Sequence, residues 1–274
     1  MLIIILVLIA ALGAVAICAA TGVLTAGIWL LWTLGLFVGL ALLYFLFLLV
    51  LCARVDQDTP REDDSKFYRV VGNLAVGAAL PFLRIRIRTS GLEKMPAEGR
   101  FLLVSNHCND SDPIILFHCL RKYNLAFISK RENKTMFVIG PMMHMLLCQL
   151  INRENDREAL KTILRCIQIL KEDKASIAVF PEGGILSEDG KLHHFRPGVF
   201  KIAQKANVPI VVCVLKDTKD VMYNIKHLKP SSTELKVLEV IPAEELKGVT
   251  TVDIAHRCYD LMAAELGPDL IAEE

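Results

Sequence analysis

The sequence predicts an α/β fold in which a mixed β-sheet is flanked by helices and is preceded by an N-terminal transmembrane helical hairpin. Two observations support this fold class. Residues 2–53 contain no charged side chain, so all 31 Lys and Arg and all 30 Asp and Glu lie downstream. In the downstream part, short apolar runs typical of buried strands alternate with stretches whose apolar residues recur at helical spacing. The chain therefore divides into a transmembrane segment (1–53), a linker with an interfacial helix (54–83) and a folded domain (84–274).

The uncharged N-terminal segment is long enough for two membrane passes, because one pass needs about 20 apolar residues. We expect helices near residues 2–20 and 24–52, with the turn at Thr21 and Gly22. A cleaved signal peptide is disfavoured, since the segment has no basic start and its apolar run is too long. A single long tilted helix and a hairpin that re-enters one leaflet remain open alternatives.

Charge and cysteine usage bear on location and partners. The formal net charge is +1, which does not provide the basic face that nucleic-acid binding needs. The eight cysteines are scattered without a C-x-x-C pair, as expected of reduced thiols on the cytoplasmic side. An even number of passes also returns the chain to its starting side. We therefore expect the folded domain on the cytoplasmic face of the cell membrane, with no nucleic-acid partner.

Three segments near the membrane allow two interpretations each. Lys66–Leu83 is expected to be a helix, lying either at the membrane interface or packed on the domain. Arg84–Gly91 alternates basic and aliphatic residues, which predicts a half-buried strand whose arginines face anionic headgroups or water. Residues 135–151 are apolar and contain four methionines, so they either dip into lipid or fill the core.

The remaining elements follow from periodicity and capping signals. Strands are expected within residues 101–104, 125–132, 176–180, 208–215 and 235–241. Helices are expected to begin near Asp112, Asn155, Pro197 and Thr250 or Thr251. In the second of these helices, one face is expected to hold Leu160, Ile163, Leu164, Ile167 and Leu170.

The first motif is VSNHCNDSDP, Val104–Pro113, at the end of the strand expected over 101–104. Its H-x4-D pair, His107 and Asp112, falls in a strand-to-helix loop that can bring an imidazole and a carboxylate together. Asp112 could orient one ring nitrogen while the other takes a proton from a hydroxyl, or it could only cap the following helix. Cys108 is disfavoured as a nucleophile, because neighbours in extended chain point apart and a nucleophile needs its base facing it.

The second motif is FPEGG, Phe180–Gly184, at the end of the apolar run SIAVF. SNHCNDSD followed about seventy residues later by FPEG resembles the glycerolipid acyltransferases, the family that includes 1-acylglycerol-3-phosphate acyltransferase. Two weaker blocks are similar as well, and the resemblance extends from about Arg84 to about Leu215. These blocks are Lys130-Arg131-Glu132 with Arg153, and Val208-Pro209-Ile210-Val211.

The resemblance implies an acyltransferase catalytic domain with the family's α/β fold, and it implies roles for the matched residues. His107 would be the base and Asp112 its orienting partner. The block Phe180, Pro181, Glu182, Gly183 and Gly184 would bind the acceptor, with Glu182 accepting hydrogen bonds from hydroxyls. Lys130, Arg131 and Arg153 would hold an anionic group.

The reaction so implied transfers a fatty acyl group from acyl-CoA or acyl-ACP to the hydroxyl of lysophosphatidic acid, giving phosphatidic acid. It needs no metal and no cofactor beyond the thioester co-substrate, and membrane phospholipids are the expected surroundings. Three alternatives remain open: another lysophospholipid as acceptor, transacylation between phospholipids, and an inactive lipid-binding scaffold.

The chain departs from the family at one informative place. The family's block is FPEGTRS, whose arginine helps to hold the acceptor phosphate, whereas this chain has Ile185 and Leu186 after FPEGG. Arg196, in HHFRPG, could substitute for the missing arginine. The neighbouring His193 and His194 are expected to be loop residues rather than metal ligands, because no further ligands lie at suitable spacing.

Overall fold

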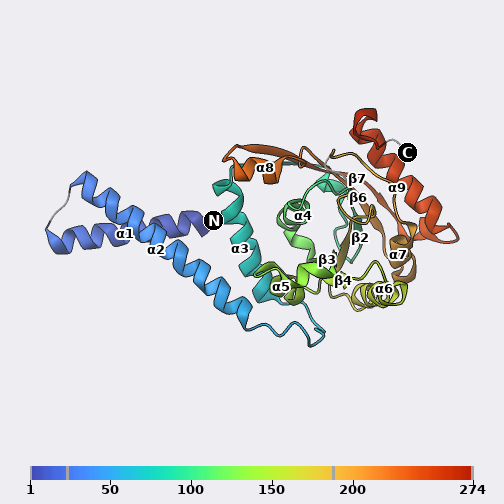
Figure 1. Ribbon diagram of the computed structural model, residues 1–274, viewed down its shortest axis with the longest axis horizontal. Helices are drawn as coiled ribbons and strands as arrows, with labels where there is room; N and C mark the ends of the chain where they lie inside the picture. The colour runs from blue at the N-terminus through green and yellow to red at the C-terminus, as the bar shows by residue number, and fades with distance from the viewer. Residues whose placement is uncertain (1, 23–24, 187–188, 273–274) are drawn as a thin grey trace.

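The computed structural model describes residues 2–22, 25–186 and 189–272, and over these residues the chain forms a helical hairpin joined to an α/β domain (Figure 1). The hairpin consists of α1 (Leu2–Thr21) and α2 (Ala26–Ala53), which confirms the two expected helices, although residue 24 lies outside the described residues. Both helices are long and apolar enough to cross a membrane. Most of their side chains are not buried inside the protein, as membrane association requires.

The helix α3 (Lys66–Phe82) follows the linker and begins after Ser65, whose hydroxyl accepts a hydrogen bond from the backbone N–H of Tyr68. One face of α3 packs on the domain and on α1. On that face, Arg69 pairs with Asp64 at 2.7 Å and donates to the backbone carbonyl of Leu125. The opposite side carries exposed apolar side chains. Packing on the domain is therefore confirmed, whereas a position at the membrane interface stays a prediction.

Within the described residues, the sheet has seven strands in the order β1-β7-β6-β2-β5-β3-β4. Their bounds are β1 (Ile85–Ser90), β2 (Leu102–Val104), β3 (Leu125–Lys130), β4 (Gln149–Ile151), β5 (Ser176–Val179), β6 (Ile210–Lys216) and β7 (Ser231–Ile241). Neighbouring strands are parallel except for β6 and β7, which pair antiparallel, so the expected mixed sheet is confirmed. The sequence did not predict β4.

Helices cover both faces of this sheet, as Figure 1 shows. The remaining α-helices are α4 (Asp112–Cys119), α5 (Ile139–Met145), α6 (Asp156–Lys171), α7 (Lys201–Ala206), α8 (Val221–Lys226) and α9 (Thr251–Leu266). Short 3-10 helices include η3 (Arg131–Thr135) and η4 (Pro197–Phe200). Leu102 and Val104 of β2 pack toward α6, α7 and α9, whereas Leu103 between them packs toward α4. Successive strand residues point to opposite faces, and this alternation builds the two core clusters.

The helix α6 begins as expected but buries a different stripe. The side chain of Asn155 accepts hydrogen bonds from the backbone N–H groups of Arg157 and Glu158, which confirms the cap. The prediction that Leu160 and Leu164 share the core face is wrong, because their side chains are 55% and 56% exposed. The stripe that packs into the core is made of Ile163, Cys166, Ile167, Ile169 and Leu170.

The arrangement of strands determines where a site can form. β2, β5, β3 and β4 run parallel, so their carboxyl ends meet at one edge of the sheet. In open α/β sheets this edge is where ligands bind. Both sequence motifs follow strands that end there.

Candidate active site

His107 and Asp112 meet in the loop after β2. The Nδ1 atom of His107 lies 3.0 Å from Oδ2 of Asp112, and the carboxylate is fully buried. The same Oδ2 atom accepts hydrogen bonds from the backbone N–H groups of Cys108 (2.7 Å) and Asn109 (2.8 Å). The expectation that Asp112 caps α4 is therefore wrong: it is the first residue of the helix, and its carboxylate turns back to the preceding loop. Oδ1 has no hydrogen-bond partner among the described residues.

Two asparagines whose role the sequence did not predict fasten this loop to the end of β6. The side chain of Asn106 accepts from the backbone N–H of Leu215 (2.8 Å) and donates to its carbonyl (2.9 Å). The Asn109 side chain donates to the carbonyl of Lys219 at 2.8 Å. Asparagine suits such loops because one amide can satisfy a backbone donor and acceptor together. Their positions within SNHCND were the only sequence signal for this role.

The ring of Phe180 stacks on the imidazole of His107, with ring centroids 4.1 Å apart and planes 18° apart. Phe127 lies behind it, 6.5 Å from Phe180 between centroids. The stack and the bond to Asp112 fix the imidazole on two sides. With Nδ1 facing Asp112, Nε2 is the nitrogen that can take a proton from a substrate.

Glu182 connects the two motif loops. Its side chain is 2% exposed, and its oxygens accept hydrogen bonds from the backbone N–H groups of His107 (2.7 Å) and His193 (2.9 Å). The pKa of Glu182 is raised to about 7, because burial and, to a smaller extent, the charge of Asp112 raise it more than the two N–H groups lower it. Each of its oxygens thus binds a backbone N–H group, and the expectation that Glu182 also accepts a hydrogen bond from a substrate hydroxyl stays a prediction.

Two arginines lie against the turn formed by the FPEGG residues. A Cβ atom on Gly183 would stand 2.7 Å from Nε of Arg196, and one on Gly184 would stand 2.9 Å from Nη1 of Arg153. Both glycines have φ values in the region that favours glycine, +87° and +148°. Partial burial lowers the pKa of Arg153, and the nearby charge of Arg196 lowers it further. The turn thus brings two guanidinium groups together, and side chains in place of the glycines would displace them.

The other two predicted cations behave differently. Lys130 ends β3 and lies opposite Ile151 of β4, two residues before Arg153. Arg131 lies on η3, and its Nη1 atom is 3.4 Å from Oε2 of Glu158 on α6. The structure therefore directs Arg131 toward α6 rather than toward the turn, whereas Lys130 and Arg153 follow adjacent strands at the same sheet edge.

The thiol and the two loop histidines near the site have other partners. Burial raises the pKa of Cys108 to about 12, with the charges of Asp112 and Glu182 adding to the rise. Its sulfur donates to the carbonyl of Gly190 at 3.5 Å, so the thiol stays protonated at neutral pH and is a poor nucleophile. His193 faces Asp189, and His194 stacks on Tyr259, so the two imidazoles diverge.

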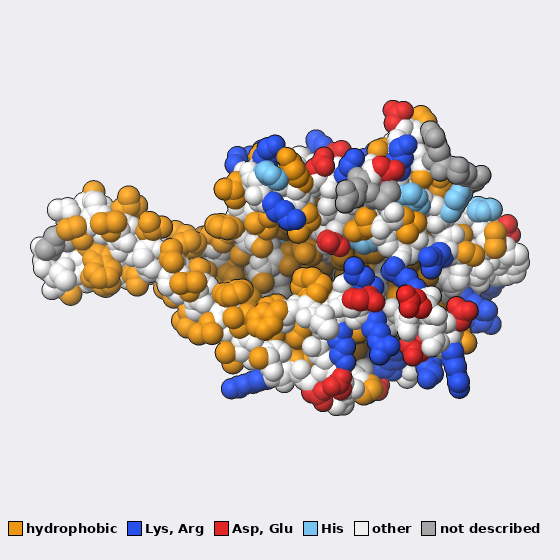
Figure 2. All heavy atoms as spheres, in the orientation of Figure 1, with side chains coloured by type: hydrophobic (Ala, Val, Ile, Leu, Met, Phe, Trp, Pro, Cys, Tyr) orange, Lys and Arg blue, Asp and Glu red, His pale blue; other side chains and the backbone are white. Residues whose placement is uncertain are grey.

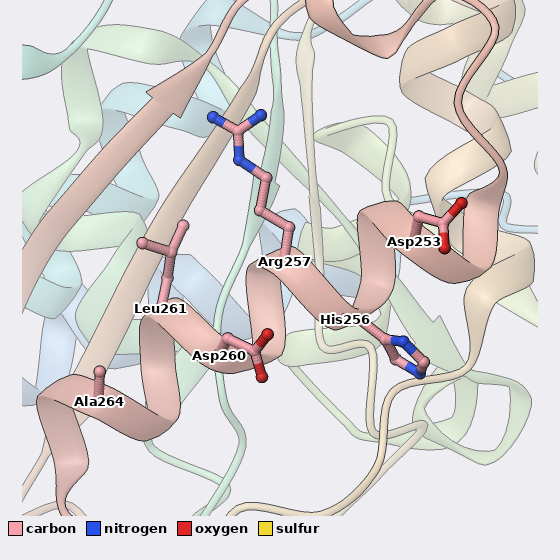
Figure 3. Close-up of a pocket in the computed structure, with 6 residues that line it drawn as sticks. All are labelled: Asp253, His256, Arg257, Asp260, Leu261 and Ala264. Atoms are coloured by element: carbon pink, nitrogen blue, oxygen red, sulfur yellow. The ribbon is translucent and has the colours of Figure 1, made fainter.

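A surface hollow on the outside of α9 lies apart from these residues (Figure 3). All six residues that line it come from one helix. Within it, Arg257 pairs with Glu239 and Glu245. A hollow with a single helix as its wall and its one arginine already paired does not converge on a ligand, and we do not assign it to the active site.

Comparisons with known proteins match this part of the chain. The family model described as Acyltransferase matches residues 86–216. A 1-acyl-sn-glycerol-3-phosphate acyltransferase of Chlamydomonas reinhardtii is 31% identical over 205 residues, covering 73% of this chain and 59% of that protein. A chloroplastic 1-acyl-sn-glycerol-3-phosphate acyltransferase of Brassica napus is 33% identical over 159 residues, covering 57% of this chain and 44% of that protein. The chain thus spans less than two thirds of these relatives.

A solved structure has the same fold. The crystal structure of the 1-acyl-sn-glycerophosphate acyltransferase PlsC from Thermotoga maritima superposes with a TM-score of 0.58 at 20% identity. The match covers 80% of this chain and 88% of that chain. At this identity the likeness supports the architecture, whereas the matched residues 86–216 contain both motif loops and both arginines that meet at the glycine turn.

Proposed function

Residues 86–216 belong to the acyltransferase family, and from this premise we propose that the protein is a membrane-bound O-acyltransferase. It transfers a fatty acyl group from acyl-CoA or acyl-ACP to the free hydroxyl of lysophosphatidic acid and so forms phosphatidic acid for phospholipid biosynthesis. The observation that carries this proposal is the His107–Asp112 pair, at 3.0 Å, at the same sheet edge as the turn against which two arginines lie. The names of the relatives in the alga and the plant support the same acceptor.

The chemistry proceeds by direct attack of the acceptor on the thioester. Nε2 of His107 takes the proton of the acceptor hydroxyl while the oxygen attacks the thioester carbonyl carbon. The tetrahedral intermediate collapses with cleavage of the carbon–sulfur bond, and the leaving thiolate receives the proton from the imidazolium. The buried carboxylate of Asp112 stabilises that imidazolium and holds the ring tautomer. Each turnover therefore ends with His107 neutral.

No acyl-enzyme forms in this scheme. The Cys108 thiol is protonated at neutral pH, and the sequence contains no G-x-S-x-G nucleophile motif. The pair of groups needed, a base and its orienting carboxylate, is complete without a metal or a bound cofactor. The thioester is a co-substrate that leaves after each turnover.

Arg153 and Arg196 provide the grip on the acceptor phosphate. Two guanidinium groups that approach the same turn offer paired donors to phosphate oxygens, and Lys130 adds a point charge at the same edge. They take the place of the arginine that the family carries after FPEG. The phosphomonoester of lysophosphatidic acid presents more charge than the diester of other lysophospholipids, which favours it as acceptor.

The hairpin keeps the domain at the membrane that holds acceptor and product. We assign the domain to the cytoplasmic face of the cell membrane, where acyl-CoA and acyl-ACP are made. This assignment rests on the even number of helices in the hairpin and on the free cysteines, many of them buried.

A panel of donors and acceptors tests the proposal with the purified full chain in phospholipid vesicles. We expect thiol release from acyl-CoA or acyl-ACP only when lysophosphatidic acid is present, with phosphatidic acid formed in equal amount. Turnover with another lysophospholipid but not with lysophosphatidic acid would refute the acceptor. Acyl transfer without any thioester would identify a transacylase, and no turnover with any pair would identify a scaffold.

A further inference from the structure

Two corners of the domain lie side by side and expose large apolar side chains. One corner joins α3 to β1 and the other joins α8 to β7. Phe82 is 77% exposed and Leu228 is 81% exposed, the two highest values for large hydrophobic side chains among the described residues. The corners are tied together, because Arg84 donates to the carbonyl of Leu228 (3.1 Å) and accepts at its own carbonyl from the N–H of Ser231 (3.1 Å).

Basic side chains surround these two apolar groups. Arg84, Lys226 and Lys229 are all exposed, and the ammonium of Lys229 lies 5.3 Å from the ring centroid of the half-exposed Tyr223. The acidic residues of this segment, Asp217 and Asp220, precede α8 and do not lie in either corner. We call this surface the corner patch, and it consists of Phe82, Arg84, Tyr223, Lys226, Leu228 and Lys229.

The backbone conformation of the two corners favours small residues rather than large side chains. Arg84 has φ of +58° and Leu228 has φ of +54°. Residues with a Cβ rarely adopt this left-handed conformation, and glycine or asparagine would adopt it at lower cost. The two turns thus hold an exposed arginine and an exposed leucine at positions where local folding favours smaller residues, so the turns themselves do not require these side chains.

The corner patch lies on the side of the domain from which the hairpin projects. Figure 1 shows the α3–β1 end and α8 on that side, and Figure 2 shows Lys, Arg and His side chains beside hydrophobic ones over the same region. α3 also contacts α1 directly. On the other side of the hairpin base, Phe137 is 72% exposed next to Val138, whose carbonyl accepts a weak bond from the Cys52 thiol of α2. Exposed apolar groups therefore flank the hairpin on both sides.

A hollow beside the corner patch is also lined by both apolar and basic side chains. The hollow lies between α3, β1 and the end of α4, and its wall includes Leu80, Pro81 and Ile85 next to the α3–β1 corner. Arg121 and Lys122 border it and are exposed. Apolar surface and cations thus continue from the corner patch along α3 and β1.

We propose that the corner patch is a second membrane contact that docks on an anionic phospholipid leaflet. Phe82 and Leu228 insert among the acyl chains near the headgroups, while Arg84, Lys226 and Lys229 meet lipid phosphates. A bilayer is the favoured occupant because the patch continues the surface of the hairpin and combines exposed apolar side chains with net positive charge. The second attachment fixes the tilt of the domain, which a hairpin alone leaves free to swing. The proposal does not depend on the acceptor or donor of the reaction.

Tryptophan fluorescence of the full chain in vesicles tests this contact. Both native tryptophans, Trp29 and Trp32, are replaced by Phe, and a single probe is introduced by Phe82→Trp. In vesicles that contain phosphatidylglycerol, we expect phospholipids brominated near the headgroup to quench this probe. The matched control is Val252→Trp, because Val252 is 46% exposed on α9, on the side of the domain away from the hairpin (Figure 1). Equal, weak quenching of both probes would overturn the proposal.

Charge reversal separates lipid docking from other causes of burial. Lys226→Glu combined with Lys229→Glu should lower the docked fraction in anionic vesicles, by roughly five-fold in the docking equilibrium for each lost positive charge. Lys161→Glu combined with Lys171→Glu on α6 should leave the quenching unchanged, and thermal unfolding checks that both variants fold. A probe that stays in water in lipid vesicles but is shielded from iodide in native membranes would show that a protein covers the patch instead, which overturns the proposal.

Discussion

One carboxylate oxygen of Asp112 faces Nδ1 of His107 and accepts two backbone N–H groups. A substitution that keeps the backbone bonds but removes the negative charge can therefore distinguish the catalytic role of Asp112 from its structural role. In Asp112→Asn, the amide oxygen can still accept the N–H groups of Cys108 and Asn109. It cannot stabilise an imidazolium, so we expect kcat to fall by roughly 10³- to 10⁴-fold. The amide nitrogen would be buried where Oδ1 has no partner, so stability should fall by about 1–3 kcal/mol.

Turnover rates and thermal unfolding in the same detergent check this prediction for Asp112→Asn and wild type. A variant that loses most of its folded population, with activity falling only in proportion, would show that Asp112 acts through structure alone.

Arg153 offers a direct test of the phosphate grip. Each charge-assisted contact to the acceptor contributes on the order of 1.5 to 3 kcal/mol, so Arg153→Ala should raise the acceptor KM by roughly ten- to a hundred-fold. The thioester KM should stay nearly unchanged. Arg153→Lys should recover part of the loss, since a point charge cannot reproduce a two-pronged grip. The control is Arg131→Ala, because Arg131 faces Glu158 and should change the acceptor KM little.

Steady-state kinetics with each substrate varied in turn provides these KM values. Equal effects of Arg131→Ala and Arg153→Ala would contradict the assignment of the grip to the glycine turn.

Glu182 should make stability depend on pH in a defined direction. Burial raises its pKa from 4.5 to about 7, so the folded chain binds more protons than the unfolded chain between these values. This contribution to stability is fully present below pH 4.5 and is lost as the pH rises through about 7. The change from 4.5 to about 7 corresponds to roughly 3 kcal/mol. Glu182→Gln cannot ionise and should lack this decline.

Unfolding of wild type and Glu182→Gln at a series of pH values from about 4 to 8 measures the difference. The wild-type free energy of unfolding should fall relative to the variant across this window, whereas parallel curves would show that Glu182 keeps an ordinary pKa.

The roles of single residues were predictable where a motif states them and unpredictable where they depend on distant backbone. His107, Asp112 and the possible substitute Arg196 were identified from spacing and family resemblance, and the structure brings them to one edge. The structural role of Glu182 was not predicted, because its partners are backbone N–H groups of residues 75 and 11 positions away. No local pattern reports which amides a folded loop presents to a carboxylate.

Among the elements, α6 shows what periodicity leaves open. A stripe containing Ile163, Ile167 and Leu170 was correctly expected to be buried, whereas Leu164, about 100° around the helix from Ile163, lies outside it. A leucine at the edge of an apolar stripe fits the helical spacing of apolar residues even when its side chain is exposed. The rotation of the helix against the sheet decides which edge of the stripe is buried, and this rotation depends on tertiary packing.

A matched pair of substitutions tests this burial. Leu170 is 3% exposed and Leu164 is 56% exposed. Leu170→Ala should cost about 2–5 kcal/mol, because it removes buried methyl groups and leaves a cavity. Leu164→Ala should change stability by less than about 0.5 kcal/mol, since the side chain already faces solvent. Chemical denaturation of both variants gives the two values, and similar losses would contradict the orientation of α6.

The short strand β4 is an element that the sequence did not predict. It has three residues, Gln149–Ile151, and pairs only with β3 at the edge of the sheet. It ends the apolar segment 135–151, whose four methionines precede the strand, and such a composition suits lipid, core or strand equally. β4 matters for the site because Arg153 lies two residues after its end, and the pairing with β3 places Ile151 opposite Lys130.

At the scale of the whole molecule, the structure combines a hairpin of two helices long and apolar enough to cross a membrane with an α/β domain whose two motif loops meet at one sheet edge. The hairpin was predictable because 52 residues without charge, 2–53, are long enough for two membrane passes and too apolar for a surface helix. The mixed sheet was predictable from alternating strand and helix signals. Strand order was not predictable, because β7 reaches the sheet by an antiparallel pairing with β6 and then accepts the first strand on its other side.

The proposed reaction is tested most directly by the rate of phosphatidic acid formation from lysophosphatidic acid and acyl-CoA by the purified full chain in phospholipid vesicles, compared between wild type and His107→Ala. We expect turnover by wild type with one thiol released per phosphatidic acid. We also expect the variant to lose nearly all turnover without loss of folding, because it lacks the imidazole that takes the proton of the acceptor hydroxyl. Equal rates in the two proteins, or no phosphatidic acid from wild type, would contradict the proposed reaction.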